Sequence, residues 1–179
     1  MGVQKSALYH HYPSKQAILE FITKRGTFEV LPELEVIAAS PAPVEERLSQ
    51  VIRRIILIIC SRPAEAGIQV VLFVFERRSL PASLLVQHRN TQNGLRRLIT
   101  KLVSEGIETG VFQSDNPTLT TFAILSMLGY LTVWYQQSGP SSPEEIADHF
   151  VDLIACRLLK KPSEDKSLIR VSSGVAALP

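Results

Sequence analysis

The chain has 179 residues, of which 45% are hydrophobic and 20% are charged, and its formal net charge is +2. This is the composition of an ordinary soluble globular protein, and the length suffices for one helical domain with a sizeable core and a small appendage. The longest uninterrupted apolar run is too short to span a bilayer and no signal peptide opens the chain, so we expect no membrane partner.

The two cysteines, Cys60 and Cys156, stand far apart and show no metal-binding spacing. This usage predicts reduced thiols in a cytoplasmic protein, with no metal site. Charge is distributed unevenly along the chain. Residues 1–28 carry four basic side chains against one acidic, whereas residues 29–159 carry eleven basic against fourteen acidic. Positive charge therefore collects at the N-terminal end, as phosphate binding requires.

The first fifteen residues read as a short polar-faced helix, a break, and the start of a longer helix capped by Ser14. The first helix gathers hydrogen-bond donors, aromatic rings and a cation within about two turns, a surface that suits the major groove of DNA. From composition alone, an amphipathic surface helix with incidental histidines is the favoured interpretation. The helix that starts at Lys15 continues in an apolar stripe past Phe28, and Pro32 should kink or divide it.

The segment 40–43 is a proline-rich break, and residues 44–61 then form a helix whose second half is apolar nearly all round, as a central buried helix would be. A further helix is expected over 64–78. Pro81 opens a long helix that runs to about Glu108 and ends before Gly110. Next come an apolar helix over 118–137 and a last helix from Pro143 to about Leu159, which begins with a capping box. Composition predicts a disordered tail from residue 161.

The sequence G-V-x-K-x-x-L-Y-H-H-Y-P-S-K from Gly2 to Lys15, followed by an apolar-periodic helix, resembles the recognition helix and the start of the fourth helix of tetracycline-repressor (TetR) type regulators. Residues 98–112 are similar to the family's long seventh helix, and residues 134–148 to the loop between its two dimerising helices. The resemblance implies an all-α fold. Three parts are expected: a remnant of a helix-turn-helix DNA-binding domain over 1–28, a ligand-binding and dimerisation domain over 29–160, and the tail over 161–179.

The resemblance also implies three sets of site residues. The recognition helix would contact DNA through Lys5, Ser6, Ala7, Tyr9, His10, His11 and Lys15. An inducer pocket with apolar walls and a few polar groups would use Phe73, Phe75, His88, Gln92, Met127 and Tyr130. A four-helix bundle between two subunits would use Leu125, Leu128, Gly129, Thr132, Ile146, Phe150, Leu153 and Ile154. For both helical sets, ordinary core packing is the alternative.

A bacterial transcriptional regulator follows from the resemblance. It would be a homodimer that represses by binding a palindromic operator and is released by a small apolar or amphipathic inducer. Paired arginines at 53–54, 77–78 and 96–97 could meet an anionic inducer such as an acyl-coenzyme A, although a solvated helix face explains them more simply. No catalytic arrangement is visible, so we expect no enzyme activity and no cofactor.

The family's helix-turn-helix needs two helices before Gly2, whereas this sequence starts at Met1. We therefore expect a family member that is truncated at its N-terminus. The alternative function is a ligand-binding and dimerising module without DNA binding.

Overall fold

A computed structural model describes residues 14, 17, 30–63, 66 and 80–159, and every regular element among them is helical. The elements are α3 (Leu31–Ala38), α4 (Val44–Ser61), α6 (Ala82–Glu108), α7 (Pro117–Trp134), α8 (Pro143–Val151) and η3 (Asp152–Leu158), a π-helix that continues α8. The all-α prediction is confirmed for this part of the chain. The expected DNA-binding remnant and tail lie almost entirely outside the described residues, as does most of the helix expected over 64–78.

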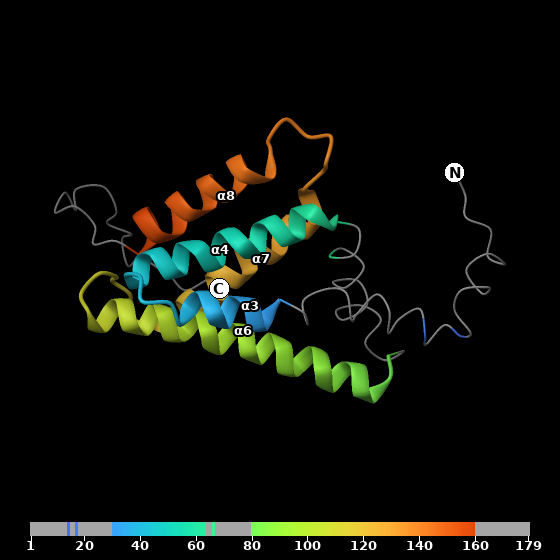
Figure 1. The fold of residues 1–179 in the computed structure, drawn as a ribbon, viewed down its shortest axis with the longest axis horizontal. Helices are drawn as coiled ribbons and strands as arrows, with labels where there is room; N and C mark the ends of the chain where they lie inside the picture. The colour runs from blue at the N-terminus through green and yellow to red at the C-terminus, as the bar shows by residue number, and fades with distance from the viewer. Residues whose placement is uncertain (1–13, 15–16, 18–29, 64–65, 67–79, 160–179) are drawn as a thin grey trace, which may run out of the picture.

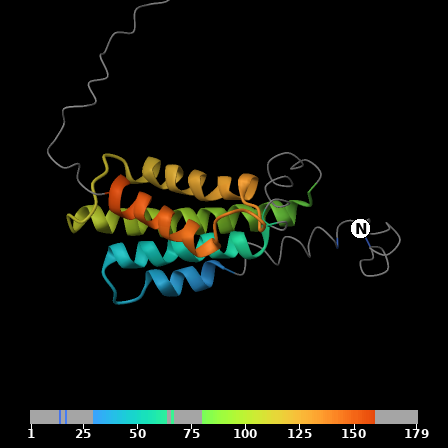
Figure 2. The same ribbon diagram turned by 90° about the horizontal axis from the view of Figure 1, so that it is seen from above.

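Helix α4 is the centre of the bundle. In Figure 1 it lies between α8 and α6, and Figure 2 shows α7 and α3 on opposite sides of the molecule. Helix α4 contacts α3, α6, α7, α8 and η3. Its inward residues Leu48, Val51, Ile52 and Ile56 are fully buried, so the expected central helix is confirmed.

The helix ends follow local sequence signals. The Ser14 Oγ accepts a hydrogen bond from the Ala17 N–H at 3.1 Å, as the predicted cap requires. Ser142 and Glu145 form the predicted capping box, with reciprocal bonds of 3.2 and 2.8 Å. Asn116 caps α7 by accepting a bond from the Leu119 N–H at 3.0 Å. These bonds satisfy N–H groups that a helix start otherwise leaves without acceptors.

The connection from α6 to α7 is a tight reversal. Gly110 has a φ of 75°, a left-handed conformation that favours glycine, and the N–H of Val111 reaches back to the Gly106 carbonyl at 2.8 Å. The predicted end of the long helix before Gly110 is therefore confirmed. Helix α7 begins at Pro117 as expected but ends at Trp134, three residues before the predicted end at 137.

Candidate dimer face and ligand-binding region

Helix α7 is apolar on both sides but buries only one of them. Thr121, Ile124, Leu128 and Leu131 face the core. The opposite side exposes large apolar side chains at helical spacing: Leu119 (63%), Phe122 (45%), Tyr130 (62%), Val133 (63%) and Trp134 (45%). Leu153 of η3 adds a further exposed apolar side chain. We call these five α7 residues the outer face of α7. A contiguous exposed apolar face of this kind is typical of an interaction surface.

The same helix meets the length and composition of a membrane span. It is the one helix in the described ranges that does so, and 22% of its residues are buried within the protomer. The sequence prediction overlooked it because Thr, Ser and Gly residues interrupt its apolar runs. Helix α7 therefore exposes an apolar surface whose contact with water is unfavourable, and burial against a partner of any kind would stabilise it.

The residues expected at the dimer interface divide between core and surface. Leu128, Ile146 and Ile154 belong to the core of the protomer, where at most 6% of each is exposed, so their side chains are not available to a second subunit in this conformation. Leu125 and Phe150 are half-buried and pack against that core. Gly129, Thr132 and Leu153 are at least partly exposed. The exposed apolar residues Leu119, Phe122, Val133 and Trp134 were not among the residues expected at the interface.

The residues expected to line an inducer pocket do not come together in the described part of the chain. Phe73 and Phe75 lie outside the described residues. His88 is half-buried and Gln92 is exposed, both on α6, and Met127 packs against the core from α7. Tyr130 belongs to the outer face of α7 instead. The DNA-contact candidates Lys5, Ser6, Ala7, Tyr9, His10, His11 and Lys15 also lie outside the described residues.

A hollow of about 480 Å³ opens between α6 and the start of α7. It is lined by Arg96, Arg97, Thr100, Lys101 and Thr118. Of these residues, only the arginine pair at 96–97 was a candidate for ligand binding from the sequence. Its neighbours on α6 follow one turn later on the same side of the helix, and Thr118 joins them because the reversal after Gly110 returns the chain to α6.

The arginine pair at 53–54 forms ion pairs with acidic side chains of the protein. Arg53 pairs with Asp148, and the Arg54 guanidinium donates two hydrogen bonds to the Glu33 carboxylate at 2.6 and 2.9 Å. These bonds lower the pKa of Glu33 and raise that of Arg54. Arg77 and Arg78 lie outside the described residues. These two ion pairs join α4 to α8 and to α3. Because Arg53 and Arg54 already hold carboxylates of the protein, they are poor candidates for binding an anionic ligand.

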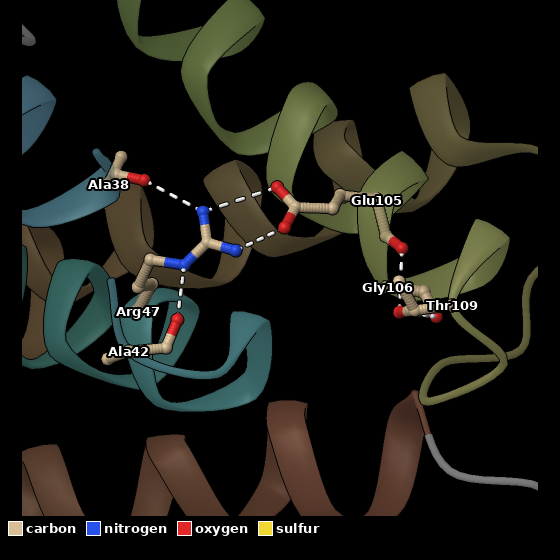
Figure 3. A network of polar contacts seen from close by, with 6 residues as sticks. All are labelled: Ala38, Ala42, Arg47, Glu105, Gly106 and Thr109. Atoms are coloured by element: carbon tan, nitrogen blue, oxygen red, sulfur yellow. Dashed lines mark hydrogen bonds and ion pairs between the residues drawn. The ribbon is translucent and has the colours of Figure 1, made fainter. Parts of the chain in front are cut away.

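Arg47 joins α3, α4 and α6 at one point (Figure 3). Its Nε donates to the Ala42 carbonyl and its Nη1 to the Ala38 carbonyl, both at 2.9 Å. The guanidinium also holds both carboxylate oxygens of Glu105 in a bidentate ion pair. The hydrogen bonds from Arg47 lower the pKa of Glu105, and the nearby charges of Arg47 and Lys101 act in the same direction. This junction fixes the C-terminal end of α3 against the long helix α6.

Residues 41–158 match the family model described as "Tetracyclin repressor-like, C-terminal domain". The chain is 23% identical over 164 residues to the HTH-type transcriptional repressor KstR2 of Mycobacterium tuberculosis, covering 89% of this chain and 79% of KstR2. The solved structure of KstR2, named there a ketosteroid transcriptional regulator, has a TM-score of 0.73 at 21% identity and covers 90% of this chain and 81% of KstR2.

Two other solved structures share the fold. The TetR family regulator PfmR from Thermus thermophilus has a TM-score of 0.72 at 25% identity, and the match covers 87% of this chain and 82% of PfmR. AibR, solved in complex with isovaleryl coenzyme A and operator DNA, has a TM-score of 0.66 at 22% identity, and the match covers 85% and 80% of the two chains. These relatives are regulators, and the match to the family model extends from the loop before α4 to the end of η3.

Proposed function

The chain belongs to the tetracycline-repressor (TetR) family of transcriptional regulators, and from this membership we propose that it represses transcription as a homodimer on operator DNA. A small apolar or amphipathic molecule that binds among the helices of the C-terminal domain would release it. The observation that carries the dimer is the outer face of α7, which exposes five large apolar side chains in one stripe. Burial of this stripe against its copy in a second subunit removes it from water.

A two-fold dimer determines what kind of DNA it binds. Two copies of the candidate recognition helix, carrying Lys5, Tyr9 and His10, would be related by the dimer axis and would read a palindromic operator. Lys15 would contact phosphates from the start of the next helix, where the helix dipole favours an anion. A regulator of this kind acts in the compartment that holds the DNA, which in a bacterium is the cytoplasm.

Release by an inducer requires that the inducer binds the two conformations of the protein with different affinity. Helix α3 is suited to transmit such a difference, because it leads from residue 30 toward the N-terminal segment while its other end is held by Arg47. The complex of AibR with isovaleryl coenzyme A supports an acyl-coenzyme A as one candidate inducer.

The test combines the oligomeric state with operator binding. Sedimentation equilibrium of the full chain should give a dimer, and selection from a pool of random duplexes should enrich a palindrome that the dimer binds specifically at physiological salt. A dimer that enriches no sequence would favour the alternative function, a ligand-binding and dimerising module without DNA binding. A monomer that partitions into lipid vesicles would contradict both functions, since it would assign the outer face of α7 to a membrane.

A further inference from the structure

The hollow between α6 and α7 carries positive charge with which no carboxylate in the described ranges forms an ion pair. Arg96, Arg97 and Lys101 line it, and no carboxylate does. Elsewhere in the described ranges, Arg47, Arg53 and Arg54 each hold a carboxylate in an ion pair. The acidic side chain that acts on Lys101 is Glu105, and its two oxygens are already held by Arg47.

The arrangement of these cations is unfavourable without an anion. Arg97 and Lys101 are four residues apart on one helix, and like charges at this spacing repel each other. Arg97 and Lys101 are exposed and Arg96 is half-buried, so all three can reach a ligand in the hollow. A bound anion would turn this repulsion into attraction.

Of the remaining lining residues, Thr118 adds an uncharged hydrogen-bond donor and Thr100 connects α6 to α7. Thr118 is the second residue of α7, so its N–H has no acceptor within the helix, whereas the Leu119 N–H is taken by Asn116. Thr100 donates to the Thr121 hydroxyl at 3.0 Å, which ties the two walls of the hollow together. The positive end of the α7 dipole therefore adds to the three side-chain cations.

One wall of the hollow continues into an apolar surface. The Arg96 guanidinium lies over the Phe122 ring, 5.9 Å from its centroid, and Phe122 belongs to the outer face of α7. A guanidinium that stacks on an aromatic ring uses its flat face for that contact. Its N–H groups lie in the guanidinium plane and can still donate hydrogen bonds to an anion. The Phe122 ring thus supports one of the three cations that line the hollow.

We infer that this hollow binds the phosphate groups of a small phosphorylated molecule. Planar guanidinium forks match phosphate oxygens in a bidentate manner, and two arginines with a lysine provide for more than one phosphate group. The hollow is open to solvent, so a small anion can reach the three cations directly. Only the regulatory meaning of this site rests on the proposed function, since the binding itself needs neither an operator nor a dimer.

Isothermal titration calorimetry tests the site on the full chain at constant ionic strength, with two probes. Inorganic pyrophosphate tests recognition of phosphate alone, and coenzyme A tests an organic phosphate, with pantetheine as its phosphate-free counterpart. The variant is Arg97→Glu with Lys101→Glu, both exposed and therefore compatible with folding. The matched control is Arg89→Glu, an exposed arginine on the same helix that does not line the hollow.

We expect at least one phosphate probe to bind the wild-type chain and the Arg89→Glu control equally. In the double variant the affinity should fall about 100-fold, because two charge-assisted contacts become repulsive. Equal affinities of pyrophosphate and coenzyme A would mean that phosphate alone is recognised, and tighter coenzyme A binding would mean that its third phosphate or its organic part adds contacts. The inference is overturned if neither probe binds, if pantetheine binds as well as coenzyme A, or if the double variant retains affinity.

The outcome is separable from that of the proposed function. Phosphate binding that persists in a chain without operator binding would uphold the site and refute the repressor. If the charge reversal left phosphate affinity unchanged but abolished binding to duplex DNA of any sequence, the site would belong to nucleic acid and this inference would be wrong.

Discussion

The ring of Phe112 lies directly over Gly106, so close that a β-carbon on the glycine would stand 2.7 Å from the ring Cγ. Phe112 is 4% exposed and belongs to the main core. The glycine thus allows the chain after α6 to fold back onto its last turn. This reversal sets the start of α7, and with it the hollow and the outer face of α7.

Gly106→Ala should destabilise the protein. The added methyl group must displace a buried ring, which costs about 1–3 kcal/mol, and the better helix propensity of alanine offsets only about 1 kcal/mol of that. We expect a melting temperature a few degrees lower at equal protein concentration. Asn90→Ala, at an exposed position of the same helix, is the matched control for the gain in helix propensity. A Gly106→Ala protein as stable as the wild type would show that the ring can move without loss.

Val133→Glu should weaken the proposed dimer by at least about 100-fold. Val133 is 63% exposed on the outer face of α7, so the protomer should still fold, but a dimer would have to bury a carboxylate on each side of its axis. Analytical ultracentrifugation over a range of concentrations measures the change. Val36→Glu is the control, because Val36 is 73% exposed on α3, away from this face.

Equal loss of dimer in both valine variants would point to a general effect of added charge. No loss in either would place the interface elsewhere and leave the outer face of α7 without an assigned partner.

The sequence predicted the helices well because their limits depend on local chemistry. Pro43 before α4, Gly110 after α6, and Ser142 with Glu145 at the start of α8 each satisfy or interrupt backbone hydrogen bonds within a few residues. Such signals are independent of the rest of the fold. Pro32 stands in the first turn of α3, a position that proline favours, and the helix expected before it lies outside the described residues.

The assignment of side chains to sites was less successful because it depends on which face of a helix meets the core. Helix α7 is apolar all round, so its sequence does not tell whether Leu128 or Val133 points inward, and the structure buries Leu128. Tyr130 was expected in a pocket and lies on the surface for the same reason. Thr118 and Lys101 line the same hollow because the chain reverses its direction between them, and no periodic pattern in the sequence predicts such proximity.

Lys15→Ala should weaken binding to duplex DNA of any sequence and reduce the slope of affinity against salt concentration by about one unit. The reason is that Lys15 is expected to neutralise one phosphate without reading a base. Fluorescence anisotropy at several salt concentrations, on specific and random duplexes, provides both quantities. Tyr9→Ala is the contrasting variant, since it should reduce affinity for the operator more than for random DNA. An unchanged salt slope in Lys15→Ala would refute the phosphate contact.

The bidentate pair of Arg47 and Glu105 should make stability depend on pH in the acid range. Hydrogen bonds from Arg47 hold the pKa of Glu105 below its ordinary value, as Arg54 does for Glu33. A carboxyl group whose pKa is lower in the folded state stabilises that state above the pKa of the unfolded chain, about 4.3. This contribution is lost as the pH falls through the lower, folded pKa.

The urea midpoint of the wild-type protein should therefore decrease on acidification below about pH 4.3. In Glu105→Gln it should be lower than wild type at pH 7 and should decrease less on acidification, because the group that takes up the proton is gone. Glu108→Gln, at the exposed end of the same helix, should follow the wild-type curve. If Glu105→Gln kept the full acid dependence, the stabilisation would come from other carboxylates, and Arg47 would hold α3 through the Ala38 and Ala42 carbonyls alone.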